Sequence, residues 1–220
     1  MTSHLVDLWP PAGVRVTCGD LELRFLDDGL LAALADLAAQ GVHDPDAMPF
    51  VVPWTRGTPD EVRRSVLQYQ WKLRAEASSA RCGLELGVLR DGELLGVQGL
   101  YTERFAVTRT AETGSWLGRR FQGQGVGTAM RLAVLHLIFD GLGAERATTT
   151  AFADNAPSNG VTRRLGYRDN GTDVAVRDDA SVVSRRYVLD RATWSARSDE
   201  QRAPVTLEGV DRLREFLGVS

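Results

Sequence analysis

A glycine-rich segment constrains this chain more than any other feature. Gly123, Gly125 and Gly127 stand at alternate positions, after a strand-like run over 112–117 and before an amphipathic helix. Glycine permits positive φ values and lets a ligand approach the backbone closely. The first N–H groups of a helix have no intrahelical acceptor, and together with the helix dipole they favour an anion, most often a phosphate. The segment therefore predicts a phosphate or pyrophosphate site at residues 122–128.

The spacing of the glycines separates this segment from two common nucleotide motifs. The P-loop places a lysine and then a serine or threonine after its last glycine, whereas Gly127 is followed directly by Thr128. The dinucleotide-binding fingerprint reads G-x-G-x-x-G, whereas the glycines here follow G-x-G-x-G. A nucleotide-binding protein of another fold stays open as one reading, and a plain glycine-rich turn as another.

The patterns around the segment predict a mixed α/β domain. An Asp91-Gly92 pair between two apolar runs indicates a β-hairpin. The expected strands are 21–25, 84–89, 94–101, 112–117, 146–152, 174–176 and 182–189. Two helices are expected to begin at the caps Asp27 and Thr58. Three more are expected over 128–139, 157–165 and 207–217. An antiparallel first half, followed by a crossover helix after the glycines, fits this order.

Composition indicates one globular domain with appendages. The chain has 220 residues, of which 43% are hydrophobic and 25% charged, and its net charge is −3. We expect no nucleic-acid partner because there is no basic excess, and no membrane partner because no apolar run reaches about 18 residues. No signal-peptide pattern opens the chain, so we expect a cytoplasmic protein. The predicted parts are an irregular N-terminal arm over 1–19, a domain over 20–190 and a helical extension over 191–220.

Cysteine and histidine usage gives no sign of a disulfide framework or a metal. Cys18 and Cys82 are expected to be reduced thiols that take no part in catalysis. His4, His43 and His136 lie far apart, and no Cys/His cluster has the spacing of a zinc site. We therefore expect that the protein holds no metal.

Two motifs resemble the GNAT superfamily, the GCN5-related N-acyltransferases. Gln122, Gly125 and Gly127 match the acyl-CoA pyrophosphate loop, Arg/Gln-x-x-Gly-x-Gly/Ala, and 112–117 resembles the bulged central strand. Downstream, Asn155-Ala156-Pro157-Ser158 and then Arg163-Arg164-Leu165-Gly166-Tyr167 resemble a signature of the branch that includes the ribosomal-protein serine N-acetyltransferases. The resemblance spans roughly residues 20–190 and implies the GNAT fold, a mixed, mostly antiparallel central sheet flanked by helices.

The resemblance implies how acetyl-CoA, the co-substrate, would be held. The implied contacts to its pyrophosphate, through backbone amides, are Gln122, Gly123, Gln124, Gly125, Val126, Gly127 and Thr128. The implied main-chain contacts to its pantetheine arm are Trp116, Leu117 and Gly118, with the Trp116 side chain expected in the core. Asn155 is expected to bond the same arm, and Asn159 is an additional CoA contact. For Arg119 and Arg120 two readings stay open, namely contacts to the CoA phosphates and a solvated pair of charges.

Two residues are predicted to take part in the chemistry. Ser158 resembles the hydroxyl that the family places near the CoA sulfur, where it would protonate the leaving thiolate. Its alternative is a plain helix-terminal hydroxyl. Glu112 is the predicted base for the attacking ammonium group, with Glu103 as a second candidate and a surface acid as the alternative reading. Tyr167 is expected to be structural.

The acceptor side is predicted to come from the proline-rich loop over 41–57. His43, Asp44, Phe50 and Trp54 are its candidate pocket residues, and inward packing of the aromatic rings is the alternative. The function expected from the resemblance is transfer of an acetyl group, or alternatively a succinyl group, to the primary amine of a small molecule or a peptide or protein N-terminus. A non-catalytic acyl-CoA sensor on the same fold is the alternative function, and a homodimer is the expected assembly.

Overall fold

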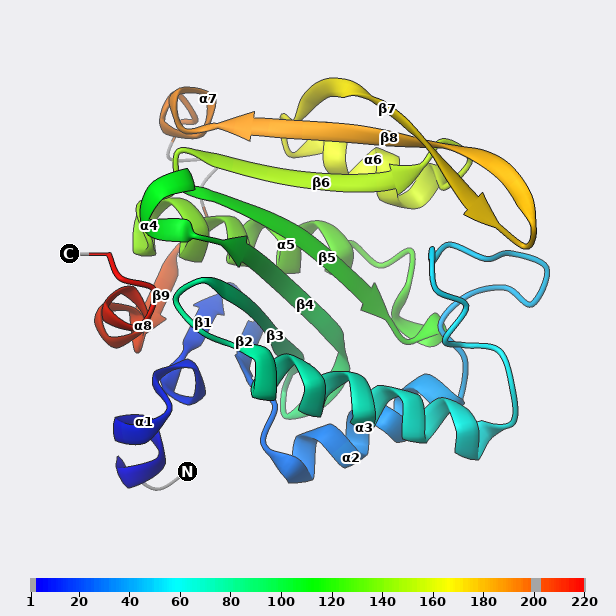
Figure 1. Cartoon of the computed structure of the whole chain (residues 1–220), viewed down its shortest axis with the longest axis horizontal. Coiled ribbons are helices and arrows are strands. Elements are labelled where there is room, and N and C mark those ends of the chain that lie inside the picture. Colours follow the sequence, from blue (N-terminus) through cyan, green and yellow to red (C-terminus); the bar gives the residue numbers. More distant parts are fainter. Residues whose placement is uncertain (1–2, 199–202, 220) are drawn as a thin grey trace.

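The described residues form a nine-stranded sheet with helices on both sides. The structure is a computed structural model that describes residues 3–198 and 203–219 (Figure 1). The strand order across the sheet is β7-β8-β6-β5-β4-β3-β2-β1-β9. The strands are β1 (Arg15–Cys18), β2 (Leu21–Phe25), β3 (Arg81–Arg90), β4 (Glu93–Glu103), β5 (Thr110–Leu117), β6 (Arg146–Phe152), β7 (Arg168–Arg177), β8 (Ala180–Asp190) and β9 (Val205–Glu208). The helices are α1 (Ser3–Leu8), η1 (Pro10–Gly13), α2 (Asp28–Ala39), α3 (Pro59–Glu76), α4 (Phe105–Thr108), η2 (Arg119–Phe121), α5 (Val126–His136), η3 (Leu137–Gly141), α6 (Ala156–Arg164), α7 (Arg191–Ser195) and α8 (Val210–Phe216).

Neighbouring strands run antiparallel everywhere except between β5 and β6, which are parallel. Helix α5 and the π-helical turn η3 make the crossover that joins them. The parallel ladder pairs only Thr110–Glu112 with Arg146–Thr148, and beyond it the two strands part. The predicted α/β class, with a mixed, mostly antiparallel central sheet flanked by helices, is confirmed.

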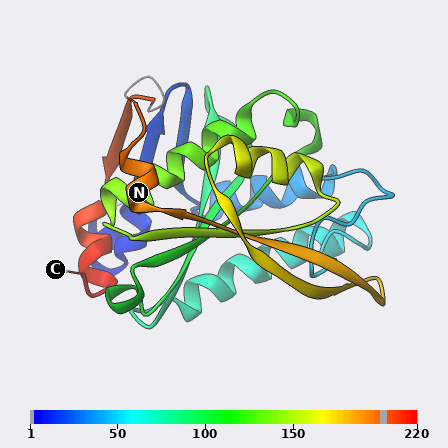
Figure 2. The same cartoon turned by 90° about the horizontal axis from the view of Figure 1, so that it is seen from above.

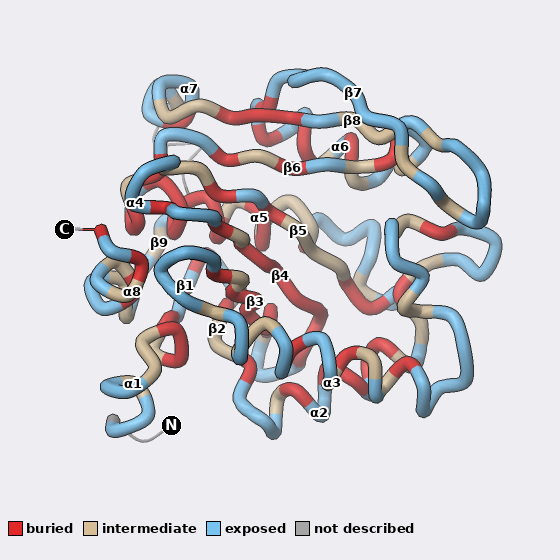
Figure 3. The backbone as a smooth tube through the Cα atoms, in the orientation of Figure 1, coloured by how far each residue is buried: buried red, intermediate tan, exposed pale blue. Residues whose placement is uncertain are grey.

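Helices cover the two faces of the sheet (Figures 1 and 2), and each face has its own apolar core. On the side that we call the α5 face, Leu86, Leu100 and Val134 belong to the larger core. On the opposite side, the α3 face, α2 and α3 bury a second core that includes Leu34 and Val97. Figure 3 shows burial along most of β3 and β4, whereas β7 at the sheet edge is exposed. None of the described helices is long and apolar enough to cross a bilayer.

Local signals place the early elements as expected. The Asp27 carboxylate accepts a hydrogen bond from the Leu30 N–H (2.9 Å) and caps α2. Thr58 and Glu61 form a reciprocal capping box at the start of α3. Asp91 (φ 51°) and Gly92 (φ 81°) both adopt the left-handed region, which suits the tight β3–β4 hairpin predicted from this pair.

The β7–β8 hairpin is much longer than the sequence pattern indicated. The expected strand over 174–176 extends back to Arg168, and a register shift lies between Asp169 and Thr172. The first seven residues of β7 are all exposed, so this edge strand carries no apolar alternation that would reveal it.

Two short segments, one near each end of the described chain, pair into the sheet, which corrects part of the predicted irregular arm over 1–19 and part of the predicted helical extension over 191–220. Residues 15–18 pair with β2, so the expectation of an irregular arm is wrong there. Within the C-terminal extension, expected to be helical, β9 pairs with β1 through Val205–Glu208. The sequence pattern does not predict these strands because each has only four residues. Strand β1 lies next to proline and glycine, and β9 lies next to a predicted helix. The first and last described segments therefore stabilise one another.

We expect Gly209→Ala to destabilise this junction. Gly209 has φ +73°, and a Cβ there would lie 2.3 Å from the Gly13 carbonyl oxygen. The left-handed conformation alone costs a non-glycine residue about 1–3 kcal/mol, and the contact adds to that cost. Gly19→Ala is the matched control because Gly19 also has positive φ but has open space around it. Urea denaturation should show the larger loss for Gly209→Ala, and equal losses would contradict the docking of the two ends.

Candidate functional site

The parting of β5 and β6 opens a fork in the sheet. Where the ladder ends, the Thr113 hydroxyl donates to the Thr148 carbonyl (3.2 Å), and the Thr149 hydroxyl donates to the Thr113 carbonyl (2.9 Å). Beyond this point β5 continues to Leu117, paired with β4 on one side only. Its other edge therefore offers backbone N–H and C=O groups to an extended ligand in the fork.

The glycine-rich loop follows β5 directly and leads into α5. Gly123 (φ 73°) and Gly125 (φ 84°) adopt the left-handed conformation, and no atom lies within 4 Å of a Cβ placed on either. Within the described part of the chain, no backbone carbonyl accepts a hydrogen bond from the N–H groups of residues 123–127. Five successive unpaired N–H groups at a helix start form a cradle that suits a phosphate.

The glycine-rich loop is held by contacts from the loop over 41–57, which precedes α3. The Gln122 amide donates to the carbonyls of Val42 (2.7 Å) and Leu117 (3.0 Å). The Arg119 N–H donates to the Gly41 carbonyl (3.0 Å), and its guanidinium pairs with Asp44. The Gln122 side chain thus holds the glycine-rich loop in shape, and Asp44, predicted for the acceptor pocket, pairs with Arg119 just before that loop.

Several other predicted contact groups already have partners within the chain. The Gly118 N–H donates to the Leu95 carbonyl (2.9 Å), and the Thr128 N–H donates to the Gly125 carbonyl (3.0 Å). The Gln124 amide bonds the Arg120 carbonyl (2.8 Å), while Arg120 itself contacts Gln40 (2.7 Å) and Glu93 (3.1 Å). Val126, the first residue of α5, buries its side chain. The N–H groups of residues 123–127 are therefore the part of the loop best suited to a ligand.

Helix α6 brings the second motif to the other side of the fork. Asn155 caps the helix through its side-chain oxygen, which accepts from the Ser158 N–H (3.2 Å), and Ser158 is half-buried in the first turn. Asn159 is only 3% exposed, and its amide donates to the Phe152 carbonyl (2.9 Å) and accepts from the Tyr187 hydroxyl (2.7 Å). We therefore correct the prediction for Asn159, because these partners give it a structural role.

A buried arginine behind β5 was not predicted as a site residue. Arg131, on α5, is 5% exposed and donates to Gln98 (3.3 Å), Ser115 (3.1 Å) and Thr149 (3.3 Å). No described carboxylate lies within 4 Å of its guanidinium. An unpaired buried cation costs several kcal/mol, so its place beside the fork points to a use for positive potential there. The signal was visible in the sequence as a lone arginine beside Met130 and Val134 on the apolar stripe of the helix.

Tyr167, for which a structural role is predicted, also lies in this region. Its side chain is buried, and its hydroxyl is 3.5 Å from that of Thr113. Burial raises the pKa of Tyr167 above its ordinary value, so the phenol keeps its proton.

On the α3 face, aromatic rings from the loop over 41–57 reach β5. Ring centroids are 5.8 Å apart for His43 and Phe50, 5.0 Å for Phe50 and Trp54, and 5.5 Å for Trp54 and Trp116. The four side chains are half-buried, so they pack inward and also present edges to solvent. The structure thus brings three predicted acceptor residues together with Trp116, whose ring lies on this face of the core.

The tip of the β7–β8 hairpin borders the same loop (Figure 1). Arg56 pairs with Asp178 (2.6 Å), and Arg177 pairs with Asp154 (2.6 Å) and reaches the Met48 carbonyl (3.5 Å). The loop, the hairpin tip and the turn before α6 are therefore joined to one another. Glu112 lies at the last pair of the β5–β6 ladder, exposed on β5, where it faces Tyr101 across the β4–β5 ladder.

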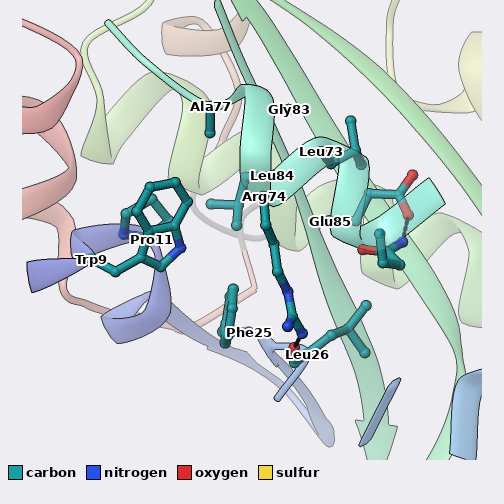
Figure 4. A pocket seen from close by; sticks show the side chains of 11 residues that line it. Trp9, Pro11, Phe25, Leu26, Leu73, Arg74, Ala77, Gly83, Leu84 and Glu85 are labelled. Atoms are coloured by element: carbon teal, nitrogen blue, oxygen red, sulfur yellow. Dashed lines mark hydrogen bonds between the residues drawn. The ribbon is translucent and has the colours of Figure 1, made fainter. Parts of the chain in front are cut away.

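Two features lie apart from the fork. A pocket beneath α3 is lined mostly by apolar residues, together with Gln70, Arg74 and Glu85, and none of the predicted site residues contributes to it (Figure 4). The thiols of Cys18 and Cys82 are free and buried. Burial raises the pKa of both, that of Cys82 to about 11, so neither is a nucleophile at neutral pH.

Comparison with known proteins finds one family model and several relatives. A family model described as an acetyltransferase (GNAT) domain matches residues 20–168. YdaF of Bacillus subtilis, described as a candidate ribosomal N-acetyltransferase, is 34% identical over 89 residues, which are 40% of this chain and 48% of that protein. The match thus spans about half the length of this curated relative.

Solved structures share the same architecture. Mycobacterium smegmatis RimJ in complex with a CoA disulfide has a TM-score of 0.68 at 22% identity, covering 89% of this chain and 97% of that chain. RimL, a ribosomal α-N-protein acetyltransferase in complex with coenzyme A, has a TM-score of 0.60 at 22% identity, covering 80% and 96%. At these identities the likeness establishes the fold.

Proposed function

Because this chain belongs to the GNAT acetyltransferase family, we propose that it transfers an acetyl group from acetyl-CoA to a primary amine. The observation that carries the proposal is the anion cradle at residues 123–127 directly beside the open edge of β5. Coenzyme A combines a pyrophosphate with an extended, amide-bearing arm, and these two neighbours suit those two parts. An amine attacks a thioester directly, so the reaction proceeds in a ternary complex without an acyl-enzyme.

Ser158 is the proposed proton donor to the departing sulfur. It stands in the first turn of α6, whose cap Asn155 is the proposed partner of the pantetheine arm. A hydroxyl donor stabilises a leaving thiolate as the tetrahedral intermediate collapses. Arg131, buried behind β5, adds positive potential where negative charge develops on oxygen and sulfur. Glu112 stays the sequence-based candidate for the base.

A peptide or protein N-terminus is the acceptor that we propose. The descriptions of YdaF and RimL point to ribosomal proteins, and RimL to an α-amine. The aromatic row His43, Phe50, Trp54 and Trp116 would contact the first side chain of such a peptide. A small-molecule amine and a succinyl donor are the alternatives that the experiment distinguishes.

The test is acyl transfer from acetyl-CoA and succinyl-CoA to three acceptor sets. These are lysine-free peptides with free N-termini, the same peptides with formylated N-termini, and a panel of small amines. Thiol release and product mass report the reaction. We expect acetylation of the free peptides alone. Transfer only to small amines would contradict the proposed acceptor, and CoA binding without transfer to any amine would favour the sensor.

We expect Gly125→Asp to weaken CoA binding at least about tenfold. Gly125 has φ +84°, so a side chain there is strained, and a carboxylate would repel the pyrophosphate. Gly19→Asp is the matched control, because it makes the same change at a positive φ in an open turn outside the loop. Calorimetry measures the Kd of CoA, and equal affinities for the two variants would contradict the loop assignment.

We expect Ser158→Ala to lower kcat about 100-fold while the Kd of acetyl-CoA changes little, because the hydroxyl acts on the leaving group. Ser181→Ala, on the exposed part of β8, controls for the loss of a serine hydroxyl elsewhere. Single-turnover kinetics measures the chemical step. A wild-type rate in Ser158→Ala would remove this residue from the mechanism.

A further inference from the structure

A buried carboxylate on the α3 face has no place in the mechanism above. Glu85, on β3, is 9% exposed and accepts hydrogen bonds from the Gln70 amide and the Tyr101 hydroxyl. No described arginine, lysine or histidine lies within 4 Å of it. Burial raises the pKa of Glu85, which makes it a stronger proton acceptor near neutral pH than a hydrated carboxylate.

The sheet is shaped to hold the Tyr101 ring flat against it. Gly99 and Gly114 pair across β4 and β5, and Gly83 on β3 pairs with Tyr101 itself; a Cβ on any of the three would meet the Tyr101 side chain. A Cβ on Gly99 would lie 2.6 Å from the Tyr101 hydroxyl oxygen, and one on Gly114 would lie 3.3 Å from the ring. The three glycines therefore fix the phenol above β4 and β5, where β5 has already left β6.

The hydroxyl of Tyr101 connects the carboxylate with the surface. It donates to Glu85 and accepts from the Tyr69 hydroxyl (3.4 Å), and Tyr69 is 46% exposed on α3. Burial and the nearby Glu85 charge raise the pKa of both phenols, so each keeps its proton. A phenol in this state passes a proton along its hydrogen bonds without storing charge.

The other charged groups around this chain of hydroxyls are engaged elsewhere or lie outside it. Arg74, on α3, pairs with Asp28 (2.7 Å) and donates to the Leu26 carbonyl. The charge of Arg81 lowers the pKa of Tyr69, and among the described residues Arg81 forms no ion pair with Glu85. Glu85 is thus the proton-accepting end of this arrangement.

We propose that Glu85 accepts the proton of the substrate ammonium group through the hydroxyl of Tyr101. The inference rests on the proposed amine acetylation, and it supplies a base that the sequence analysis did not consider. Tyr101 is the group that would touch the substrate, whereas Glu85 acts through it. Glu112, opposite Tyr101 and exposed, contributes charge that attracts the ammonium group.

The protons balance in two steps. The ammonium group gives one proton to the Tyr101 oxygen as the Tyr101 proton passes to Glu85, and the freed nitrogen lone pair attacks the thioester carbon. The C–N bond forms, the C–S bond breaks, and the second nitrogen proton reaches the sulfur as the intermediate collapses. Glu85 then releases its proton through Tyr101 and Tyr69 to solvent, so one proton leaves per turnover.

The pH dependence of kcat, measured with saturating acetyl-CoA and peptide, tests this assignment. We expect the wild-type kcat to fall at low pH as Glu85 becomes protonated. Glu85→Gln should lower kcat about 100-fold and abolish this acidic limb, because an amide cannot accept the proton. Tyr101→Phe should likewise lower kcat and abolish the acidic limb, and it keeps the aromatic ring packed on the glycines. If Glu85→Gln does not fold, Tyr101→Phe alone tests the proposal.

Glu112→Gln tests the rival base candidate on the same face, and Glu76→Gln, at an exposed carboxylate on α3, is the matched control. Both should keep the acidic limb, and all four variants should bind CoA with the wild-type Kd. An acidic limb that survives in Glu85→Gln or Tyr101→Phe, or that disappears in Glu112→Gln, would overturn the proposal. Absence of acyl transfer by the wild-type protein would instead contradict the proposed function itself.

Discussion

The site depends on the parting of two parallel strands. The β5–β6 ladder ends after three residue pairs, and hydroxyls of Thr113 and Thr149 satisfy the carbonyls where it stops. A strand edge inside a sheet is otherwise paired, because a buried unpaired N–H or C=O group costs about 1–3 kcal/mol. The fork therefore exposes backbone groups at the centre of the molecule, and Arg131 adds positive charge behind them.

The glycine-rich loop and the aromatic segment over 41–57 are physically linked. Gln122 and Arg119, at the glycine-rich loop, hold Val42, Gly41 and Asp44 at the start of the aromatic segment. The far end of that segment is held by the β7–β8 tip through the Arg56–Asp178 pair. The same contacts that shape the loop over 123–127 thus position the aromatic row over β5, so the loop and the row have one common support.

The sequence predicts those parts of the structure that have local signals. Caps at Asp27 and Thr58, the Asp91-Gly92 turn and the glycine loop all depend on neighbouring residues, and they stand where expected. Strands β1 and β9 escaped because four residues give too little periodicity. Two features were not predicted for another reason. The surroundings of Arg131 and of the Glu85–Tyr101 pair come from burial by residues far away in the sequence.

The central claim is that coenzyme A occupies the fork and the loop together. Amide hydrogen exchange, with and without desulfo-CoA, tests it directly, because both regions carry backbone N–H groups without partners. The account predicts slower exchange at residues 114–117 and 123–127 on binding, with β7 unchanged. Protection confined to other segments, such as the pocket beneath α3, would contradict it.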